Sequence, residues 1–433
     1  MPLTPAWIAT ALGLAITGAF SWLAARDMRR ATLVFLVTGW VPFVRVFTFH
    51  GSQIQQPLLL AEALPTVMIA IWWLRRARGP APPLVPAPVN RPLLLMVPAS
   101  ALALLWSFGD LDPAVPAANV KLAVSLGQIL LIAWPVGLYF VVANTAWDAA
   151  AIRRVRTALT IMAAPSVALP LVPAEWRSHI TWSAYFALAA GPWLVAEAFE
   201  ERTLARRLGL WIVALSPLLY GLVIGKAFLY LTTLVAVAAV VFIRARKTVG
   251  VGMLGAAGIY LLLVAATGSL TPGPLRDLLD VERRQQSWGG QAGRLALAAD
   301  AVEIWSRHPL LGVGPGNSWP YMHRYSTLDT PHNQYLNVLL EFGAVGLACF
   351  VWFLAAALKT GRDALRRARD GPARNLVIGW LALFIGMIAS GLTGDYIFHS
   401  VRNGGLLLFS AYYFQWVLLG LVVAASAGGG DGA

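Results

Sequence analysis

Residues 333–357 read NQYLNVLLEFGAVGLACFVWFLAAA, a run with one charged residue, Glu341. An α-helix needs about 20 mostly apolar residues to cross the hydrocarbon core of a membrane. Runs of this kind recur along the chain, which is 58% hydrophobic and 12% charged, with a mean hydropathy of +0.67. A soluble domain carries roughly 25% charged residues. The sequence therefore predicts an all-α polytopic membrane protein and excludes a soluble globular domain.

The apolar runs predict 12 or 13 transmembrane helices. They cover residues 6–25, 31–49, 57–74, 92–109, 120–143, 157–173, 179–196, 208–224, 226–243, 248–268, 333–357, 375–394 and 405–425. No basic residue precedes the first run, so we interpret it as a retained span rather than a secretory signal. The C-terminus is expected in the cytoplasm. Thirteen spans place the N-terminus outside, and twelve place it inside.

Basic residues gather in alternate connections between these runs. The clusters hold 22 of the 33 Lys and Arg and lie within residues 26–30, 75–91, 153–156, 202–207, 244–247 and 359–374. Lys and Arg accumulate in cytoplasmic loops. The formal net charge of +13 therefore reflects topology, and no nucleic-acid partner is needed to explain it. The single cysteine excludes an internal disulfide.

Three regions follow from this pattern. Residues 1–268 are expected to form membrane helices 1–10, and residues 332–433 the C-terminal membrane helices. Between them, residues 269–331 form the longest hydrophilic segment, which the charge alternation places outside. Apolar residues recur at helical spacing from residue 291 to 305, so this loop is predicted to contain an amphipathic helix. A long structured loop over a compact membrane domain is more often functional than accidental.

Eleven basic residues lie within spans or on the outer side, where topology does not require them. They are Arg45, Lys121, Arg177, Lys226, Arg276, Arg283, Arg284, Arg294, Arg307, Arg324 and Arg402. The long loop holds six of them together with six acids, so some, above all Arg276 and Arg307, are expected to be ion-paired. Lys226 lies between two apolar halves. It either reaches the outer interface or faces a polar cavity.

The start of the 333–357 run carries a second group of candidates. Thr330 is predicted to be the N-cap and Pro331 the first helical residue, which places His332 in the opening turn. Free N–H groups and the positive dipole end make such a terminus an anion site. Asn333, Asn337 and Glu341 follow as a polar stripe. The alternative is an interfacial histidine whose stripe packs against neighbouring spans.

Other polar residues give weaker signals. Gly312, Gly314 and Gly316 form a turn where backbone can approach a ligand closely. The remaining histidines lack metal-ligand spacing, so no metal site is expected. Asp395, His399 and Arg402 fall on the outer side, where they either line the same cavity as His332 or cap their helices.

The sequence GRLALAADAVEIWSRHPLLGVGPGNSW (293–319), continued by HNQYLNVLLEFGAVGL (332–347), resembles the signature region of the O-antigen ligase and polysaccharide polymerase superfamily. The common features are a helix between arginine and tryptophan, a glycine-rich turn and an HN..YL…E.G..GL entry into a membrane helix. The similarity covers about residues 293–354. Elsewhere the chain agrees only in hydropathy and in the long outer loop.

The resemblance implies a GT-C-like glycosyltransferase of the bacterial cytoplasmic membrane, with its active site on the periplasmic side. Its donor would be an undecaprenyl-diphosphate-linked glycan, and its acceptor a lipid A–core sugar for a ligase or another lipid-linked repeat for a polymerase. His332 matches the functional histidine of the family and Arg294 its loop arginine, whereas Lys226 stands where the family has arginine. No cofactor is implied.

Diphosphate is a good leaving group, so transfer needs positive charge near it and a base near the attacking hydroxyl. The predicted catalytic residues are His332 and Arg294. The predicted substrate-binding residues are Lys226, Arg283, Arg284, Gly314 and Asn333. A transporter that uses Arg45, Glu62 and Lys226 as a charge pathway is the main rival. A non-catalytic scaffold is a third reading.

Overall fold

The computed structural model describes residues 5–38, 45–50, 55–80, 82–110, 112, 115, 122–173, 176, 181–224, 227–244, 252, 255, 294–324, 330–401 and 412–427. Side chains at 5–10, 38, 45–50, 55–61, 227, 294 and 295 are not among the described ones. All statements below concern the described residues.

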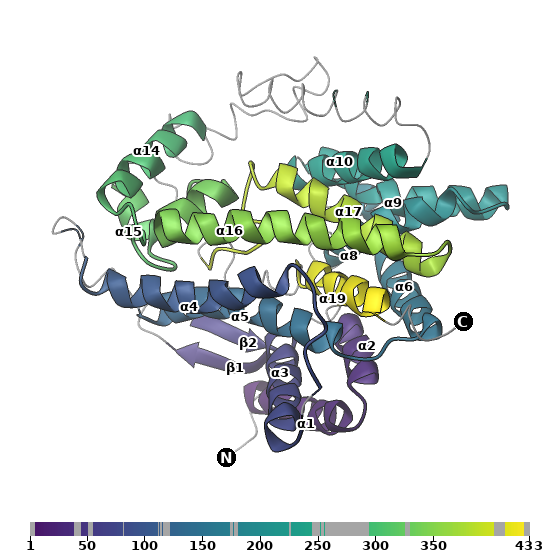
Figure 1. Cartoon of the computed structure of the whole chain (residues 1–433), viewed down its shortest axis with the longest axis horizontal. Helices are drawn as coiled ribbons and strands as arrows, with labels where there is room; N and C mark the ends of the chain where they lie inside the picture. The colour runs from purple at the N-terminus through teal and green to yellow at the C-terminus, as the bar shows by residue number, and fades with distance from the viewer. Residues whose placement is uncertain are drawn as a thin grey trace.

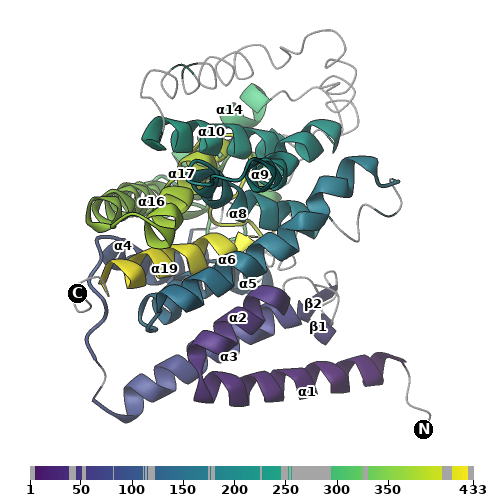
Figure 2. The same ribbon diagram turned by 90° about the vertical axis from the view of Figure 1, so that its right-hand side faces the viewer.

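Helices make up nearly all of the described structure (Figures 1 and 2). The helices are α1 Pro5–Arg26, α2 Met28–Thr38, α3 Leu60–Arg78, α4 Asn90–Ser107, α5 Leu122–Ala143, α6 Ala149–Ala163, the 3₁₀-helix η2 Ala164–Leu171, α8 Trp182–Ala198, α9 Leu204–Ile224, α10 Ala227–Arg244, α14 Arg294–Arg307, α15 Ser318–Met322, α16 Gln334–Arg367, α17 Pro372–Ser390 and α19 Phe414–Ala427. Four of them, α5, α9, α16 and α17, are long and apolar enough to cross a membrane. The predicted class, an all-α polytopic membrane protein, is confirmed, whereas the number of spans stays a prediction.

The second predicted span, residues 31–49, is wrong. Helix α2 ends at Thr38, and Arg45–His50 forms a strand, β1, that pairs antiparallel with β2, Gln55–Leu59. Pro42 disfavours a continuing helix, and β1 (RVFTFH) is rich in the β-branched and aromatic residues that favour strands. Hydropathy alone does not distinguish such an apolar hairpin from a helix.

The predicted span 157–173 also takes another form. Helix α6 starts earlier, at Ala149, where the Asp148 side chain accepts a hydrogen bond from the Ala151 N–H group. At Ala164 the chain continues as η2, whose sequence APSVALPL contains two prolines. Each proline removes a backbone donor, so two of them within eight residues disfavour a regular α-helix here.

Long helices lie side by side around α8 and α16. Helix α8 contacts α9, α10 and α17, while α16 packs on α4 and α17, and α5 packs on α19. In Figure 1, α14 and α15 lie near the N-terminal end of α16, and the α16–α17 connection lies at the other end of the bundle. The motif residues at the start of α16 and the basic residues in its last turn, Arg366 and Arg367, therefore lie at opposite ends of this helix.

Ion pairs secure the end of the bundle where the predicted cytoplasmic clusters lie. Arg156 of α6 pairs with Glu197 of α8 at 2.7 Å. Arg244 of α10 pairs with Glu200 at 2.8 Å and also hydrogen bonds to Asn375 of α17. Some of the basic residues explained above by topology therefore also join helices.

Candidate functional site

The glycine-rich turn and the helix that follows it form one interlocked unit. Val313 N–H donates to the Leu340 carbonyl at 2.9 Å, and Gly314 N–H donates to the Glu341 carbonyl at 3.0 Å. In return, Ala344 N–H donates to the Pro309 carbonyl at 2.9 Å. These bonds run across a break in α16, where Gly343 has φ 64° and ψ −164°. The turn thus replaces the backbone partners that α16 loses at its break.

Two glycines permit this close approach. A Cβ on Gly343 would lie 2.3 Å from the Leu310 carbonyl carbon, and a Cβ on Gly312 would lie 2.5 Å from the Leu340 carbonyl oxygen. Both residues also have positive φ, which disfavours any side chain. The spacing of the two motifs is therefore explained by backbone packing.

The three residues of the polar stripe on α16 have different structural roles. Asn333 is the N-cap, and its Oδ1 accepts from Tyr335 and Leu336 N–H. Asn337 lines a cavity. Glu341 is fully buried and accepts hydrogen bonds from Gly316 N–H at 3.0 Å and from the Ser318 hydroxyl at 2.9 Å. Two members of the stripe are thus bound to the backbone or side chains of the motif itself.

His332 lies just before α16, not inside it. The helix begins at Gln334 with Asn333 as N-cap, so the prediction that Thr330 caps and Pro331 opens the helix is wrong. The Asn333 side chain reaches two N–H groups, which makes it the better cap. His332 is half-buried and has φ 48°, the one positive φ among described non-glycine residues. Such a conformation is sparsely populated and clusters at functional sites.

The expected anion site at the end of α16 is not formed by backbone N–H groups. The Gln334 N–H donates to the Gly391 carbonyl at 2.7 Å, and Asn337 N–H donates to the Asn333 carbonyl at 2.8 Å. The Asn333 side chain takes the N–H groups of Tyr335 and Leu336. All four donors of the first turn are used, so an anion beside His332 would need charged side chains.

Gln334 connects this helix start to the loop between α17 and α19. Its Oε1 accepts from Ile397 N–H at 3.1 Å and from Phe398 N–H at 3.2 Å. Gln128 of α5 donates to the His399 carbonyl and accepts from Val401 N–H, and Gln415 of α19 donates to the Ile397 carbonyl. Buried irregular backbone needs internal partners of this kind, because water does not reach its N–H and C=O groups. Three glutamines from three helices supply them here.

The same loop carries two buried ionisable side chains. Asp395 is fully buried, and His399 is 5% exposed with its ring 3.8 Å from the ring of Tyr412. Burial lowers the pKa of His399 to about 3. The two alternatives for these residues, a common cavity with His332 and helix capping, therefore stay predictions. Arg402, the third member of that group, lies outside the described residues.

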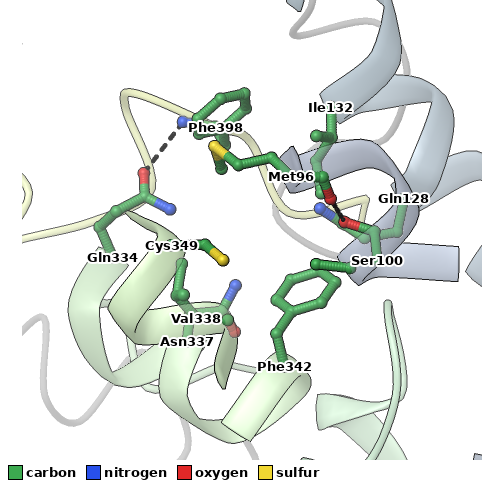
Figure 3. A pocket seen from close by; sticks show the side chains of 12 residues that line it. Met96, Ser100, Gln128, Ile132, Gln334, Asn337, Val338, Phe342, Cys349 and Phe398 are labelled. Carbon is green, nitrogen blue, oxygen red and sulfur yellow. Dashed lines mark hydrogen bonds between the residues drawn. The ribbon is translucent and has the colours of Figure 1, made fainter. Parts of the chain in front are cut away.

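A small cavity lies beside the polar stripe, between α4, α5 and α16 (Figure 3). Asn337, Gln334, Gln128 and Ser100 contribute polar groups to its lining, and Phe342 and Phe398 contribute apolar ones. Its volume is about 20 Å³. Ligand pockets measure roughly 300–1,000 Å³, so this cavity does not hold a sugar. Asn337 therefore faces a cavity that is too small for a sugar.

At the N-terminal end of α16, charged residues join the outer segment to the end of α4. Asp112 pairs with Arg324 at 3.3 Å and with Arg307 at 3.8 Å, and Arg307 also pairs with Glu303 at 2.6 Å. The buried His308 bonds through Nδ1 to Asp110 at 3.0 Å. The expected ion-pairing of Arg307 is confirmed.

A comparison with protein-family models now identifies part of the chain. Residues 185–351 match the model described as O-antigen ligase. These residues form an O-antigen ligase family domain. The match covers less than half of the chain, and a search of curated proteins finds no matching relative. It begins in α8 and ends within α16, so it includes the interlocked turn and helix break.

All predicted site residues fall inside the O-antigen ligase family domain, but the structure describes only some of them. Gly314 and Asn333 have the structural contacts given above, and their binding roles stay predictions. Arg294 is the first residue of α14, with its side chain outside the described ones. The remaining predicted site residues lie outside the described part of the chain, namely Lys226, Arg283 and Arg284. Arg276, which was expected to be ion-paired, also lies outside it.

Sequence reasoning missed several residues that organise this domain. Asp110 and Asp112 were not singled out, although two acids directly after an apolar run (FGDLDP) were a usable signal. The three glutamines gave no local signal because they lie on different helices. In α14 the buried residues are Leu297, Ala301 and Ile304, so the buried face differs slightly from the predicted apolar stripe. These missed residues add to the description of the domain around His332, but His332 stays the predicted catalytic histidine.

Proposed function

We propose that this protein is an O-antigen ligase, which transfers a glycan from undecaprenyl diphosphate to a lipid A–core sugar at the periplasmic face of the bacterial cytoplasmic membrane. The observation that carries the proposal is the backbone of His332. This motif histidine occupies the one positive-φ non-glycine position described, at a helix start fixed by Asn333 and Gln334. Strain of this kind is retained when it holds a side chain in a required place.

The proposed reaction is a displacement at the anomeric carbon. The acceptor hydroxyl oxygen forms the new bond to that carbon while the bond to the diphosphate oxygen breaks, and the diphosphate leaves with the electron pair. His332 accepts the hydroxyl proton or positions the hydroxyl for attack. Attack opposite the leaving group inverts the anomeric centre. The reaction needs no cofactor or metal.

Charged side chains are proposed to stabilise the leaving diphosphate. The first-turn N–H groups of α16 are already bonded, so the positive charge has to come from elsewhere. The candidates are Arg294, Arg283, Arg284 and Lys226, all within the family domain. Lysine at position 226 keeps the charge but loses the bidentate geometry of arginine. We expect a Lys226→Arg variant to keep activity and a Lys226→Ala variant to lose it.

The test uses two substitutions at His332 and one at a control histidine. Asparagine tolerates positive φ, so His332→Asn removes the imidazole with little backbone cost. His332→Ala removes the imidazole and also introduces a residue that tolerates positive φ less well. His323 is exposed and packs on Trp319, so His323→Asn is the matched control. We expect transfer by purified protein to fall about 10²–10⁴-fold in both His332 variants. Unchanged transfer in His332→Asn would remove the imidazole from the mechanism.

A deletion strain distinguishes the acceptors. Under the proposal, cells lacking the protein carry a bare lipid A–core, and long glycan accumulates on its lipid carrier. Single repeats attached to the core would instead indicate a polymerase with the same donor. Substrate uptake into liposomes without glycan product would favour a transporter.

A further inference from the structure

A groove lies on the outward surface of α6, beside α2, far along the chain from the motif residues. Its volume is about 560 Å³, within the range of ligand sites. Val37 of α2 forms one wall, and α6 contributes Arg153, Arg154, Ala158 and Ile161. The two helices are neighbours in Figure 1. The groove is separate from the proposed transfer site.

The lining changes from charged to apolar along α6. Arg153 and Arg154 lie near the start of the helix, and Ala158 and Ile161 lie one to two turns later on the same face. At 1.5 Å per residue, Ile161 lies roughly 11 Å beyond Arg154. Ile161 is 66% exposed, as expected for a side chain that contacts acyl chains. The groove therefore has a cationic end and an apolar end.

Neighbouring charges do not neutralise the cationic end. Asp148 bonds to Arg29 at 2.9 Å, Asp27 bonds to Arg30 at 3.2 Å, and Glu197 is engaged by Arg156. Within the described ranges, neither Arg153 nor Arg154 has an ion pair. Both are exposed. Two guanidinium groups beside the positive end of a helix form a site for a phosphate.

We propose that this groove binds one anionic phospholipid, with its headgroup phosphate on Arg153 and Arg154 and an acyl chain along Ala158 and Ile161. Basic pockets between membrane helices bind anionic headgroups, and each Lys or Arg near the surface contributes about 1 kcal/mol, which is about fivefold in affinity. The charge pattern favours phosphatidylglycerol over zwitterionic phosphatidylcholine. A soluble anion would use the cationic end but leave the apolar end without a role.

The test measures lipid retention by the purified full chain in native mass spectrometry. Phosphatidylglycerol and phosphatidylcholine with identical acyl chains are compared in the wild type and in an Arg153→Gln/Arg154→Gln variant. We expect the wild type to prefer phosphatidylglycerol and the variant to bind it roughly 25-fold more weakly. Arg202→Gln/Arg207→Gln, which removes the same charge from exposed positions outside the groove, is the control and should keep the preference.

Three outcomes would overturn the proposal. They are a preference that survives in the Arg153/Arg154 variant, an equal loss in the control, and full competition by glycerol phosphate, which has the headgroup charge without acyl chains. Size-exclusion profiles and melting temperatures confirm that all variants are folded. Glycan transfer is not the readout, so failure here leaves the proposed function untouched.

Discussion

His399 is a buried side chain that makes the stability of the folded protein depend on pH. The ring is 5% exposed, and neither nitrogen has a hydrogen-bond partner among the described residues. Burial lowers its pKa from 6.5 to about 3, because the charged form loses its hydration. The folded protein therefore holds a neutral imidazole across the physiological range, whereas the unfolded chain binds a proton below about pH 6.5.

This difference predicts acid sensitivity. Between about pH 6.5 and 3 the unfolded state binds more protons, so stability rises with pH there and is constant above it. The contribution is up to about 1.4 kcal/mol per pH unit. We expect the fall in melting temperature from pH 7.5 to pH 5 to be smaller in His399→Phe, which keeps a ring beside Tyr412. Equal falls in both proteins would contradict the assignment.

At this scale the sequence predicted residue identity better than residue conformation. The motif selected His332 because it matched a family pattern, but it predicted neither the left-handed backbone of His332 nor the long-range bond from Gln334 to Ile397. Arg307 was expected to be paired because acids were near it in sequence. Its second partner, Asp112, is about 200 residues away along the chain and was not predictable from sequence.

Helix α16 consists of two helical segments joined at a break at Gly343. The single apolar run predicted one continuous helix, and hydropathy contains no information about the inserted turn. The motif glycines were the available signal, since three close glycines followed by a fourth in EFG indicate close backbone contact. By contrast, the β1–β2 hairpin was missed because β-branched and aromatic residues also satisfy the hydropathy of a span.

The break makes a prediction about Gly343. Gly343→Ala would suffer both a positive φ and a contact of 2.3 Å with the Leu310 backbone, whereas Gly371→Ala has a positive φ (112°) and nothing within 4 Å. The conformational cost alone is about 1–2 kcal/mol. We expect Gly343→Ala to lower the melting temperature and glycan transfer markedly more than Gly371→Ala. Equal effects would mean that glycine is needed at position 343 for its positive φ alone, and not for the close contact with the Leu310 backbone.

Over the whole molecule, the alternation of basic clusters makes a prediction about sidedness. It places α14 outside and the α16–α17 connection inside, and the structure puts these segments at opposite ends of α16 (Figure 1). In a Cys349→Ala background, Ser306→Cys should react with a membrane-impermeant maleimide in spheroplasts. Asp370→Cys, at another exposed position, should react only after permeabilisation. The reverse pattern would place His332 in the cytosol and end the transfer proposal.

Composition and charge spacing were enough to predict the class of the molecule, because membrane insertion depends on local hydropathy. Its interior was not predictable in this way. Gln128, Gln334 and Gln415 lie far apart in sequence, and only the packed helices bring their amides to one loop. Long-range polar contacts of this kind give no periodic pattern in the sequence.

The hydrogen bonds from these glutamines to one loop also imply an order of assembly. Gln415 belongs to α19, which is made after every other helix described, so the segment with Asp395 and His399 lacks one of its anchors until that last helix inserts. A ribosome-bound intermediate that ends before α19 would already display His332 while its supporting loop is still incomplete. If His332 acts in transfer as proposed, catalytic competence would then be acquired only after α19 is in place.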